Sequence, residues 1–208
     1  MLTIYGRANS INVRKVLWAC GELGLAFERH DFGRGFTSTD TEAFRRISTF
    51  GVVPVLEDDG FILRESNVIV RYLCDREGRT DLLPSSPRER FTVESWMDWA
   101  ATDLYVGVRP AFQGIVFKLP QFDKPDVIAA GIADWTRQML MLEDHLASGA
   151  GFVVGETMTA ADIPVGLTVN RWYATPFDDK PELPATAAYY ERLKTRPAFQ
   201  EYGANGLP

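Results

Sequence analysis

Residues 52–66 read VVPVLEDDGFILRES, two short apolar stretches joined by an Asp-Asp-Gly turn at 58–60. The Asp-Gly step is a strong signal for the tight turn of an antiparallel hairpin. We therefore predict strands at 52–56 and 61–63. Apolar residues then recur at helical spacing over 65–76, so this unit is predicted to be strand, strand and helix.

The sequence before the hairpin predicts a unit of strand, helix and strand. Residues 2–5 are expected to form a strand, residues 12–23 a helix that Gly24 closes, and residues 26–32 a second strand. A short helix is expected at 41–47. Strand, helix, strand followed by strand, strand, helix is the thioredoxin-like plan, with one edge of the sheet antiparallel.

The sequence after Pro87 is expected to be helical throughout. Residues 78–87 form a linker rich in Pro, Ser and charged side chains. Residues 87–117 have a long amphipathic pattern and are predicted to form one extended helix, bent near Pro110. Three further helices are predicted, at 127–146, 160–173 and 185–194.

Length and composition agree with two compact domains. The chain has 208 residues, of which 46% are hydrophobic and 24% charged, an ordinary globular composition. We predict a thioredoxin-like domain at 1–80 and an all-helical bundle at 87–208. The fold class is therefore α/β plus all-α.

Charge and composition argue against several kinds of partner. The 28 acidic residues outnumber the 22 basic ones, for a net charge of -6, so neither a nucleic acid nor an anionic membrane is expected as the main partner. The start of the chain lacks the basic stretch and apolar run of a secretory signal, so a cytoplasmic protein is expected.

Cys20 and Cys74 stand far apart in apolar surroundings, which predicts buried, reduced thiols and no metal site.

Pro54 interrupts the pattern of a strand. Proline cannot donate to a sheet ladder, so it belongs at an edge, at a strand start or in a cis turn before the strand. A cis Pro54 would turn the N–H and C=O of Val53 outward, where an extended peptide ligand could pair with them. A plain strand-initiating proline explains the residue equally well.

Glu65 and Ser66 stand where the hairpin ends and the next helix begins. The N–H and hydroxyl of Ser66 can bind a carboxylate at the positive end of the helix, and Glu65 can pair with an ammonium group. Together they suit a zwitterionic amino-acid head group. Helix capping is the alternative explanation for both.

The loop at 6–12 follows the first strand, at the end of the sheet where open α/β folds bind ligands. Ser10, Asn9 and Asn12 place a hydroxyl and two amides near a helix N-terminus, an environment that stabilises a thiolate. Capping of the helix accounts for Ser10 or Asn12 equally well.

Combined, these features resemble the cytosolic glutathione S-transferase family from end to end. Residues 6–18 (GRANSINVRKVLW), 53–56 (VPVL) and 65–73 (ESNVIVRYL) look especially like its bacterial theta-like and beta-like branch. Residues 155–163 (GETMTAADI) match the family's folding motif, in which Thr159 and Asp162 would form a capping box. One departure is Ser-Thr-Phe-Gly at 48–51, where this branch commonly has Asn-Pro-Asn-Gly, near the cysteinyl-glycine end of the ligand.

The resemblance implies an enzyme that conjugates the thiolate of glutathione, its cosubstrate, to small electrophiles. Glu65 and Ser66 would hold the γ-glutamyl group, and the main chain of Val53, before Pro54, would pair with the cysteinyl residue. Ser10 is the leading donor to the thiolate, because it falls where serine-type members place their hydroxyl. The amides of Asn9 and Asn12 are the alternatives for that role.

The resemblance also implies an electrophile pocket between the domains, lined from the first helix of the bundle. Its candidate residues are Trp99, Tyr105, Arg109 and Phe112. Helical spacing makes Trp99 and Phe112 at least as suitable for the core. An Arg109 that points into the cleft would favour an acidic substrate, such as a haloacid or a conjugated carboxylate.

The family usually forms homodimers and serves detoxification, so both are expected here. Two alternatives stay open at this point. The chain would either dehalogenate or isomerise a glutathione adduct, or act as a non-catalytic interaction protein of the same fold.

Overall fold

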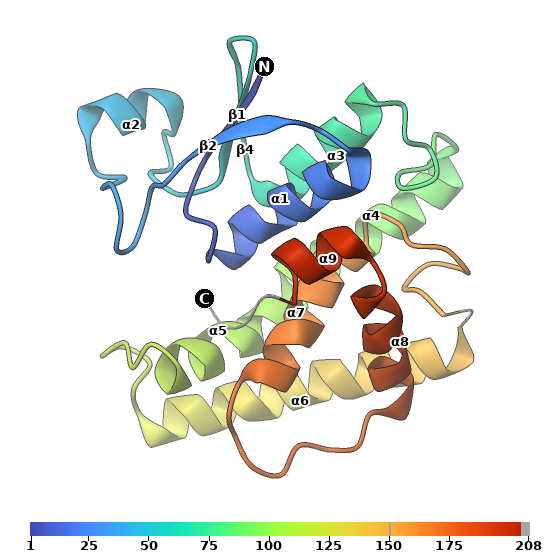
Figure 1. Cartoon of the computed structure of the whole chain (residues 1–208). Coiled ribbons are helices and arrows are strands. Elements are labelled where there is room, and N and C mark those ends of the chain that lie inside the picture. Colours follow the sequence, from blue (N-terminus) through green and yellow to red (C-terminus); the bar gives the residue numbers. More distant parts are fainter. Residues whose placement is uncertain (150, 205–208) are drawn as a thin grey trace.

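The computed structural model describes residues 1–149 and 151–204, so 205–208 at the end of the predicted bundle lie outside it. Its first part is a four-stranded sheet in the order β2-β1-β3-β4 (Figure 1). The strands are β1 (Leu2–Tyr5), β2 (Phe27–His30), β3 (Val55–Asp58) and β4 (Phe61–Arg64). β1 pairs with β2 in parallel and with β3 antiparallel, and β3 and β4 form the predicted hairpin at one edge.

The hairpin turns at Asp59 and Gly60, whose φ angles are 47° and 87°. Two positive φ angles in succession are the geometry of a tight hairpin turn, and Asp-Gly supplies them at little cost. β3 begins at Val55 rather than at the predicted residue 52. The shift follows from Pro54, which has no N–H to donate to the ladder.

Three helices accompany the sheet: α1 (Ile11–Leu23), α2 (Glu42–Ile47) and α3 (Ser66–Arg76). α1 and α3 lie side by side between the sheet and the second half of the chain (Figure 1). Their apolar faces, including Val16 on α1 and Ile69 on α3, are fully buried. The predicted thioredoxin-like arrangement is thereby confirmed.

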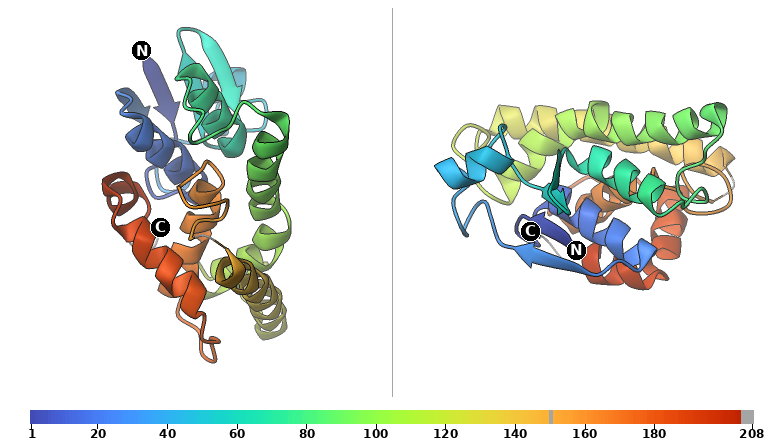
Figure 2. Two further views of the ribbon diagram at one scale, coloured as in Figure 1. Left: turned by 90° about the vertical axis from the view of Figure 1, so that its right-hand side faces the viewer. Right: turned by 90° about the horizontal axis from the view of Figure 1, so that it is seen from above.

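The second half is helical, as predicted, and Figure 2 shows its helices gathered beside the first half. The helices are α4 (Pro87–Ala101), α5 (Asp103–Ile115), α6 (Pro125–Ser148), α7 (Asp162–Ala174), α8 (Pro184–Lys194) and α9 (Pro197–Tyr202). α7 is the central one, since every residue from Asp162 to Trp172 is buried. α9 was not among the predicted helices.

The prediction of one extended helix over 87–117 is wrong. The helix breaks at Thr102, which has φ -109° and ψ -90° and separates α4 from α5. The N–H and the hydroxyl of Thr102 both donate to the carbonyl of Asp98, so they close α4. Pro110 lies inside α5 without ending it, because the carbonyl it leaves without a partner belongs to Val106, which is 64% exposed and can bind water.

The capping box predicted for Thr159 and Asp162, the first residue of α7, forms in part. Oδ2 of Asp162 accepts hydrogen bonds from the N–H of Thr159 at 2.7 Å and from its hydroxyl at 3.2 Å, and Oδ1 accepts from the N–H of Val153 at 3.0 Å. The Thr159 hydroxyl thus donates to the carboxylate instead of capping an N–H, so one half of the capping box forms. Complete burial raises the pKa of Asp162 to about 6 despite these hydrogen bonds.

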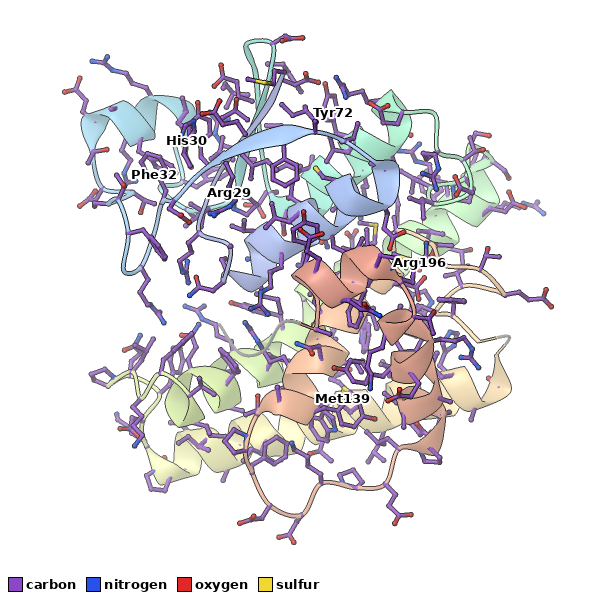
Figure 3. All side chains as sticks on the ribbon, in the orientation of Figure 1. Arg29, His30, Phe32, Tyr72, Met139 and Arg196 are labelled. Atoms are coloured by element: carbon purple, nitrogen blue, oxygen red, sulfur yellow. The ribbon has the colours of Figure 1, made fainter. Side chains whose placement is uncertain are left out.

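The two halves share one core. Trp18 of α1 packs against Phe199 of α9 with ring centroids 4.7 Å apart. Beside them Arg196, labelled in Figure 3, donates to both carboxylate oxygens of Glu22 at 2.9 and 2.6 Å. The division into domains at 1–80 and 87–208 stays a prediction.

Candidate active site

Two adjoining cavities lie where the loop after β1 and the start of α3 face the bundle. The first has a volume of about 210 Å³ and the second about 100 Å³. They share two lining residues, Asn12 at the start of α1 and Tyr105 of α5. Glu65 and Ser66, which are predicted to bind glutathione, thereby lie in a cavity next to that of the predicted thiolate-activating residues, which are Ser10, Asn9 and Asn12.

Glu65 and Ser66 line the first cavity, at the start of α3. Ser66 is the first residue of this helix and is buried, and its hydroxyl lies 3.5 Å from Oδ1 of Asn12. Glu65 just before it has φ 68°, a left-handed conformation that a residue with a side chain rarely adopts. Such strain is often found at ligand-binding sites.

Lys15 of α1 also lines the first cavity, although the sequence did not predict it as a site residue. Its side chain is only 7% exposed. Burial, with a smaller effect of the charge on Arg171, lowers the pKa of Lys15 to about 8, and Glu65 acts in the opposite direction. The first cavity therefore offers an ammonium group and a carboxylate to a ligand.

Ser10, Asn9 and Asn12 line the second cavity. Ser10 takes the N-cap position of α1 with φ -80° and ψ 126°, but its side chain makes no capping hydrogen bond. Among the described residues, nothing else binds the Ser10 hydroxyl either. Asn9 is exposed and Asn12 is half-buried. The Ser10 side chain therefore does not cap α1, and the Ser10 hydroxyl is available to a ligand.

Val53 and Pro54 lie beside the second cavity rather than in its wall. The bond between them is cis, which the sequence had left open. Within residues 1–149 and 151–204, neither the N–H nor the C=O of Val53 has a hydrogen-bond partner. A Cβ built on Gly33 would lie 3.2 Å from Nη1 of Arg7 and 3.6 Å from a methyl of Val53, so Arg7 and Val53 flank the same glycine.

The four candidates for an electrophile pocket separate into two pairs. Tyr105 and Phe112 line the second cavity. Trp99 and Arg109 line neither cavity. Nε1 of Trp99 donates to Oε1 of Gln138 at 3.1 Å, which ties α4 to α6. Arg109 is exposed, and its guanidinium lies 5.5 Å from the ring centroid of Phe122 in the loop after α5.

Three arginines that the sequence analysis did not single out line the second cavity: Arg7, Arg34 and Arg171. Burial lowers the pKa of Arg7, with a further contribution from Arg34, and burial lowers the pKa of Arg171 to about 9. Arg171 had one detectable signal in the sequence, since it is the one charged residue between Ile163 and Tyr173. Arg7 and Arg34 stand in loops, where no pattern shows the direction of a side chain.

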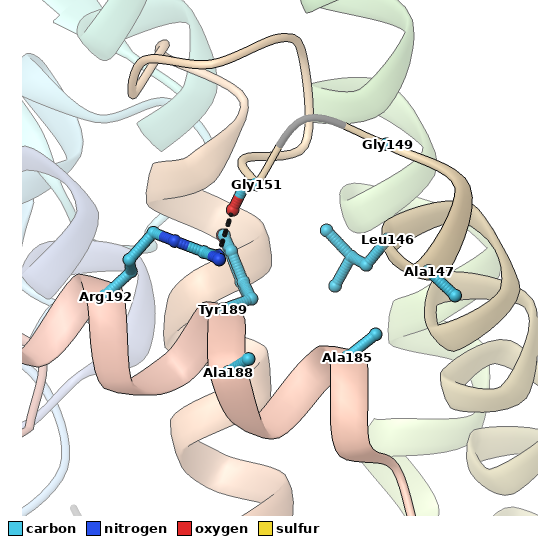
Figure 4. A pocket seen from close by; sticks show the side chains of 8 residues that line it. All are labelled: Leu146, Ala147, Gly149, Gly151, Ala185, Ala188, Tyr189 and Arg192. Carbon is cyan, nitrogen blue, oxygen red and sulfur yellow. Dashed lines mark hydrogen bonds between the residues drawn. The ribbon is translucent and has the colours of Figure 1, made fainter.

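A further cavity, of about 370 Å³, lies apart from this site, between the end of α6 and α8 (Figure 4). Small residues form most of its wall, and Arg192 beside it donates to the carbonyl of Gly151 at 2.7 Å. None of the predicted site residues lines it. In the part of the chain that the structure describes, no cluster of His, Cys, Asp and Glu could hold a metal ion.

Comparison with known proteins identifies the family. Residues 4–81 match the family model for the glutathione S-transferase N-terminal domain. Glutathione S-transferase GstB of Escherichia coli K12 is 36% identical over 97% of both chains. A theta-class glutathione S-transferase from Xanthomonas axonopodis pv. citri, solved with glutathione bound, is 36% identical, with a TM-score of 0.93 over 100% of this chain and 99% of that one.

A more distant relative is probable elongation factor 1-gamma 1 of Arabidopsis thaliana, which is 29% identical over 95% of this chain and 48% of its own. The full-length similarity to GstB is decisive, because it covers both halves of the fold. The chain belongs to the glutathione S-transferase family.

Proposed function

We propose that this chain is a glutathione transferase that conjugates the thiolate of glutathione to small electrophiles in the two adjoining cavities. The observation that carries the proposal is the position of Ser66 and Ser10 in cavities that share Asn12 and Tyr105. One cavity suits the amino-acid head group, and the other holds an unused hydroxyl where the sulfur would lie. Family membership at 36% identity over nearly the full length supports the same activity.

The first cavity binds the γ-glutamyl group in this proposal. The N–H and hydroxyl of Ser66, at the N-terminus of α3, bind the α-carboxylate, and Lys15 adds a positive charge to the same wall. Glu65 pairs with the α-ammonium. The main chain of Val53 pairs with the cysteinyl residue as a short extended strand. These contacts stretch the tripeptide along the surface between α3 and the loop after β1.

The second cavity activates the sulfur. A cysteine thiol with a pKa near 8.5 is only a few per cent ionised at neutral pH. Lowering that pKa by about two units requires roughly 2.7 kcal/mol of preferential stabilisation of the thiolate. A hydrogen bond to a charged group contributes about 1.5–3 kcal/mol and a helix N-terminus about 0.3–1 kcal/mol, so the Ser10 hydroxyl and the start of α1 suffice.

The electrophile enters the second cavity from the side of the bundle, against Tyr105 and Phe112. Holding it against the thiolate supplies the rest of the rate enhancement through proximity. Dehalogenation or isomerisation of an adduct would use the same thiolate and is the alternative chemistry. A non-catalytic role is less well supported, because Val53-Pro54 and Glu65-Ser66 are all retained.

The test is retention on immobilised glutathione followed by a conjugation assay with a generic aryl halide. We expect the wild type to be retained and active, and Glu65→Gln to lose most of its retention. Glu182→Gln is the matched control, because Glu182 is exposed and far along the chain, before α8. Failure of the wild-type protein to bind the resin would contradict the proposal.

A homodimer is the assembly we propose. Support comes from large apolar side chains that are 41–64% exposed on the loop before β3 and on β4, α3, α4 and α5. They are Phe50, Phe61, Val68, Phe91 and Val106. Light scattering should give twice the 23.3 kDa mass of one chain, and a monomer mass would contradict this assembly.

Detoxification in the cytoplasm is the setting we propose. The support is that Cys20 and Cys74 are both free and buried, and that burial raises the pKa of each to about 12. Such thiols resist oxidation and suit a reducing compartment. Among the described helices, none is long and apolar enough to cross a membrane.

A further inference from the structure

Two guanidinium groups flank a pair of phenylalanines in the wall of the second cavity. The guanidinium of Arg171, from α7, lies 3.7 Å from the ring centroid of Phe112. Phe112 meets Phe117 edge to face, with centroids 5.2 Å apart. Arg34, from the loop after β2, lies 4.3 Å from the centroid of Phe117. The two halves of the chain thus each contribute a cation to the same aromatic wall.

Arg171 is buried, and it has no anionic partner among residues 1–149 and 151–204. It is 7% exposed, and its Nε is fully buried with no hydrogen-bond acceptor within the described residues. No carboxylate of those residues forms an ion pair with it either. A buried unpaired charge is strongly unfavourable. Burial is the main cause of the lowered pKa of Arg171; Tyr105 acts in the opposite direction, and the charges of Arg14 and Arg7 lower that pKa further.

The described residues that line the second cavity include no acidic side chain. Among the described residues that line it, Arg7, Arg34 and Arg171 carry positive charge and no Asp or Glu is present. Glu65 lines the first cavity instead. This excess of positive charge is notable in a chain whose net charge is -6. A ligand with a negative group would relieve it.

We propose that the second cavity accepts an electrophile that carries a carboxylate, and that Arg171 binds this carboxylate. Arginine suits the role because its planar fork can donate two parallel hydrogen bonds to one carboxylate. The inference rests on the proposed glutathione transferase function. It assigns the carboxylate to the electrophile because Arg171 belongs to the bundle, whereas Val53, Glu65 and Ser66, proposed for glutathione, all belong to the sheet half.

In the reaction, the thiol of glutathione first loses its proton to solvent. The thiolate sulfur then attacks the electrophilic carbon, the S–C bond forms, and the carbon–halogen bond breaks. The halide leaves with the bonding electron pair. Arg171 takes no part in these bond changes and acts as a binding residue, which holds the carboxylate so that the reacting carbon faces the sulfur.

The test compares two aryl chlorides of nearly equal shape, 4-chloro-3,5-dinitrobenzoate and its neutral carboxamide. For the wild type, kcat/KM for the benzoate, corrected for the uncatalysed rates, should exceed that for the amide by at least 10-fold. Arg171→Gln should lower kcat/KM for the benzoate by about 10- to 100-fold, equivalent to about 1.4–2.8 kcal/mol, and change the amide value by less than 3-fold. Arg171→Lys should restore part of the preference.

Arg109→Gln is the matched control, because Arg109 lies outside both cavities. It should leave the preference for the benzoate unchanged. An equal loss for both substrates in Arg171→Gln would overturn the proposal, as would a raised KM for glutathione with the preference intact. If the wild type conjugates neither substrate and does not bind glutathione, the proposed function itself fails, which is a different result.

A second measurement covers the case in which Arg171→Gln does not fold. The unreactive analogue 3,5-dinitrobenzoate should inhibit the wild type competitively against the electrophile, with an inhibition constant at least 10-fold lower than that of 3,5-dinitrobenzamide. Arg34→Gln, at an exposed position, should reduce that difference. Equal inhibition by the two analogues would show that the cavity does not select for a carboxylate.

Discussion

The hydroxyl oxygen of Ser66 lies 3.5 Å from Oδ1 of Asn12, so the first turn of α3 meets the first turn of α1. This distance is at the limit of a hydrogen bond, and the contact is weak. The hydroxyl can therefore turn to a carboxylate when glutathione binds. Ser66→Ala should raise the dissociation constant of glutathione about 10-fold or more, because a hydrogen bond to a charged group is lost.

Calorimetric titration of the variant measures this effect. Ser85→Ala is the control, since Ser85 is exposed in the linker. The free energy of unfolding of Ser66→Ala should stay within about 1 kcal/mol of the wild type. Unchanged glutathione affinity in Ser66→Ala would remove Ser66 from the binding site.

Lys15 predicts opposite effects on stability and binding. Burial lowers the pKa of Lys15 to about 8, so keeping its side chain charged in the folded protein at pH 7 reduces the free energy of unfolding. This reduction disappears as the pH rises from about 8 to 10.5, the ordinary pKa of a lysine. Lys15→Met should therefore raise the free energy of unfolding of the ligand-free protein at pH 7, by at most about 3 kcal/mol. It should also weaken glutathione binding about 10-fold.

Urea unfolding and calorimetry on the same preparation would measure both effects. A variant that is less stable than the wild type would show that Lys15 serves packing rather than binding. A gain in stability with unchanged affinity would exclude the ammonium group from the glutathione site.

Asp162 predicts a pH dependence of stability. Its pKa is about 6 in the folded protein and 3.8 in the reference state, so folding favours the protonated form. Protonated Asp162 therefore adds to the free energy of unfolding. This addition is complete below the pKa of the unfolded state and is lost as the pH rises through 6. Wild type should gain about 1.4 kcal/mol from this group between pH 7 and pH 5, relative to Asp162→Asn.

The measurement is urea unfolding of both proteins at the two pH values. Asp162→Asn should be the less stable at both, because an amide cannot accept all three hydrogen bonds that the carboxylate accepts. The difference in stability should widen at pH 5. A difference that narrows would mean that the folded protein prefers the ionised carboxylate.

Gly107 allows α5 and α6 to pack closely. A Cβ at this position would lie 2.5 Å from the backbone nitrogen of Trp135. Gly107→Ala should lower the free energy of unfolding by roughly 1–3 kcal/mol, because the two helices must move apart. Ala133→Gly, at an exposed position of α6, should cost no more than about 1 kcal/mol. Stabilisation by Gly107→Ala in thermal unfolding would contradict the close packing.

Much of the first half could be predicted because its signals are local. The Asp-Gly turn, the spacing of apolar residues in α1 and α3, and the Gly24 stop all act within a few residues. The break at Thr102 was missed because the apolar pattern continues through it and no Gly or Pro marks it. Pro110, the visible marker nearby, proved compatible with a helix because the carbonyl it affects belongs to Val106, an exposed residue.

Some residues of the candidate site could be predicted from local sequence and others could not. Ser10 and Ser66 stand at helix starts, where local sequence indicates a binding role. Arg171 stands out in the sequence as a lone charge, but its place in the cavity wall beside Phe112 depends on tertiary packing that no local pattern contains. Arg109 had the right charge and helix for an acidic substrate, but its side chain packs on Phe122 outside the cavities.

The proposed transferase activity depends most on activation of the glutathione thiol beside Ser10. Ultraviolet titration of the thiolate in the wild-type complex with glutathione measures this directly. We expect a thiol pKa about two units below the free value near 8.5, and a pKa closer to the free value in Ser10→Ala, while Asn9→Ala changes little. A thiol that titrates near 8.5 in the wild-type complex would contradict the account.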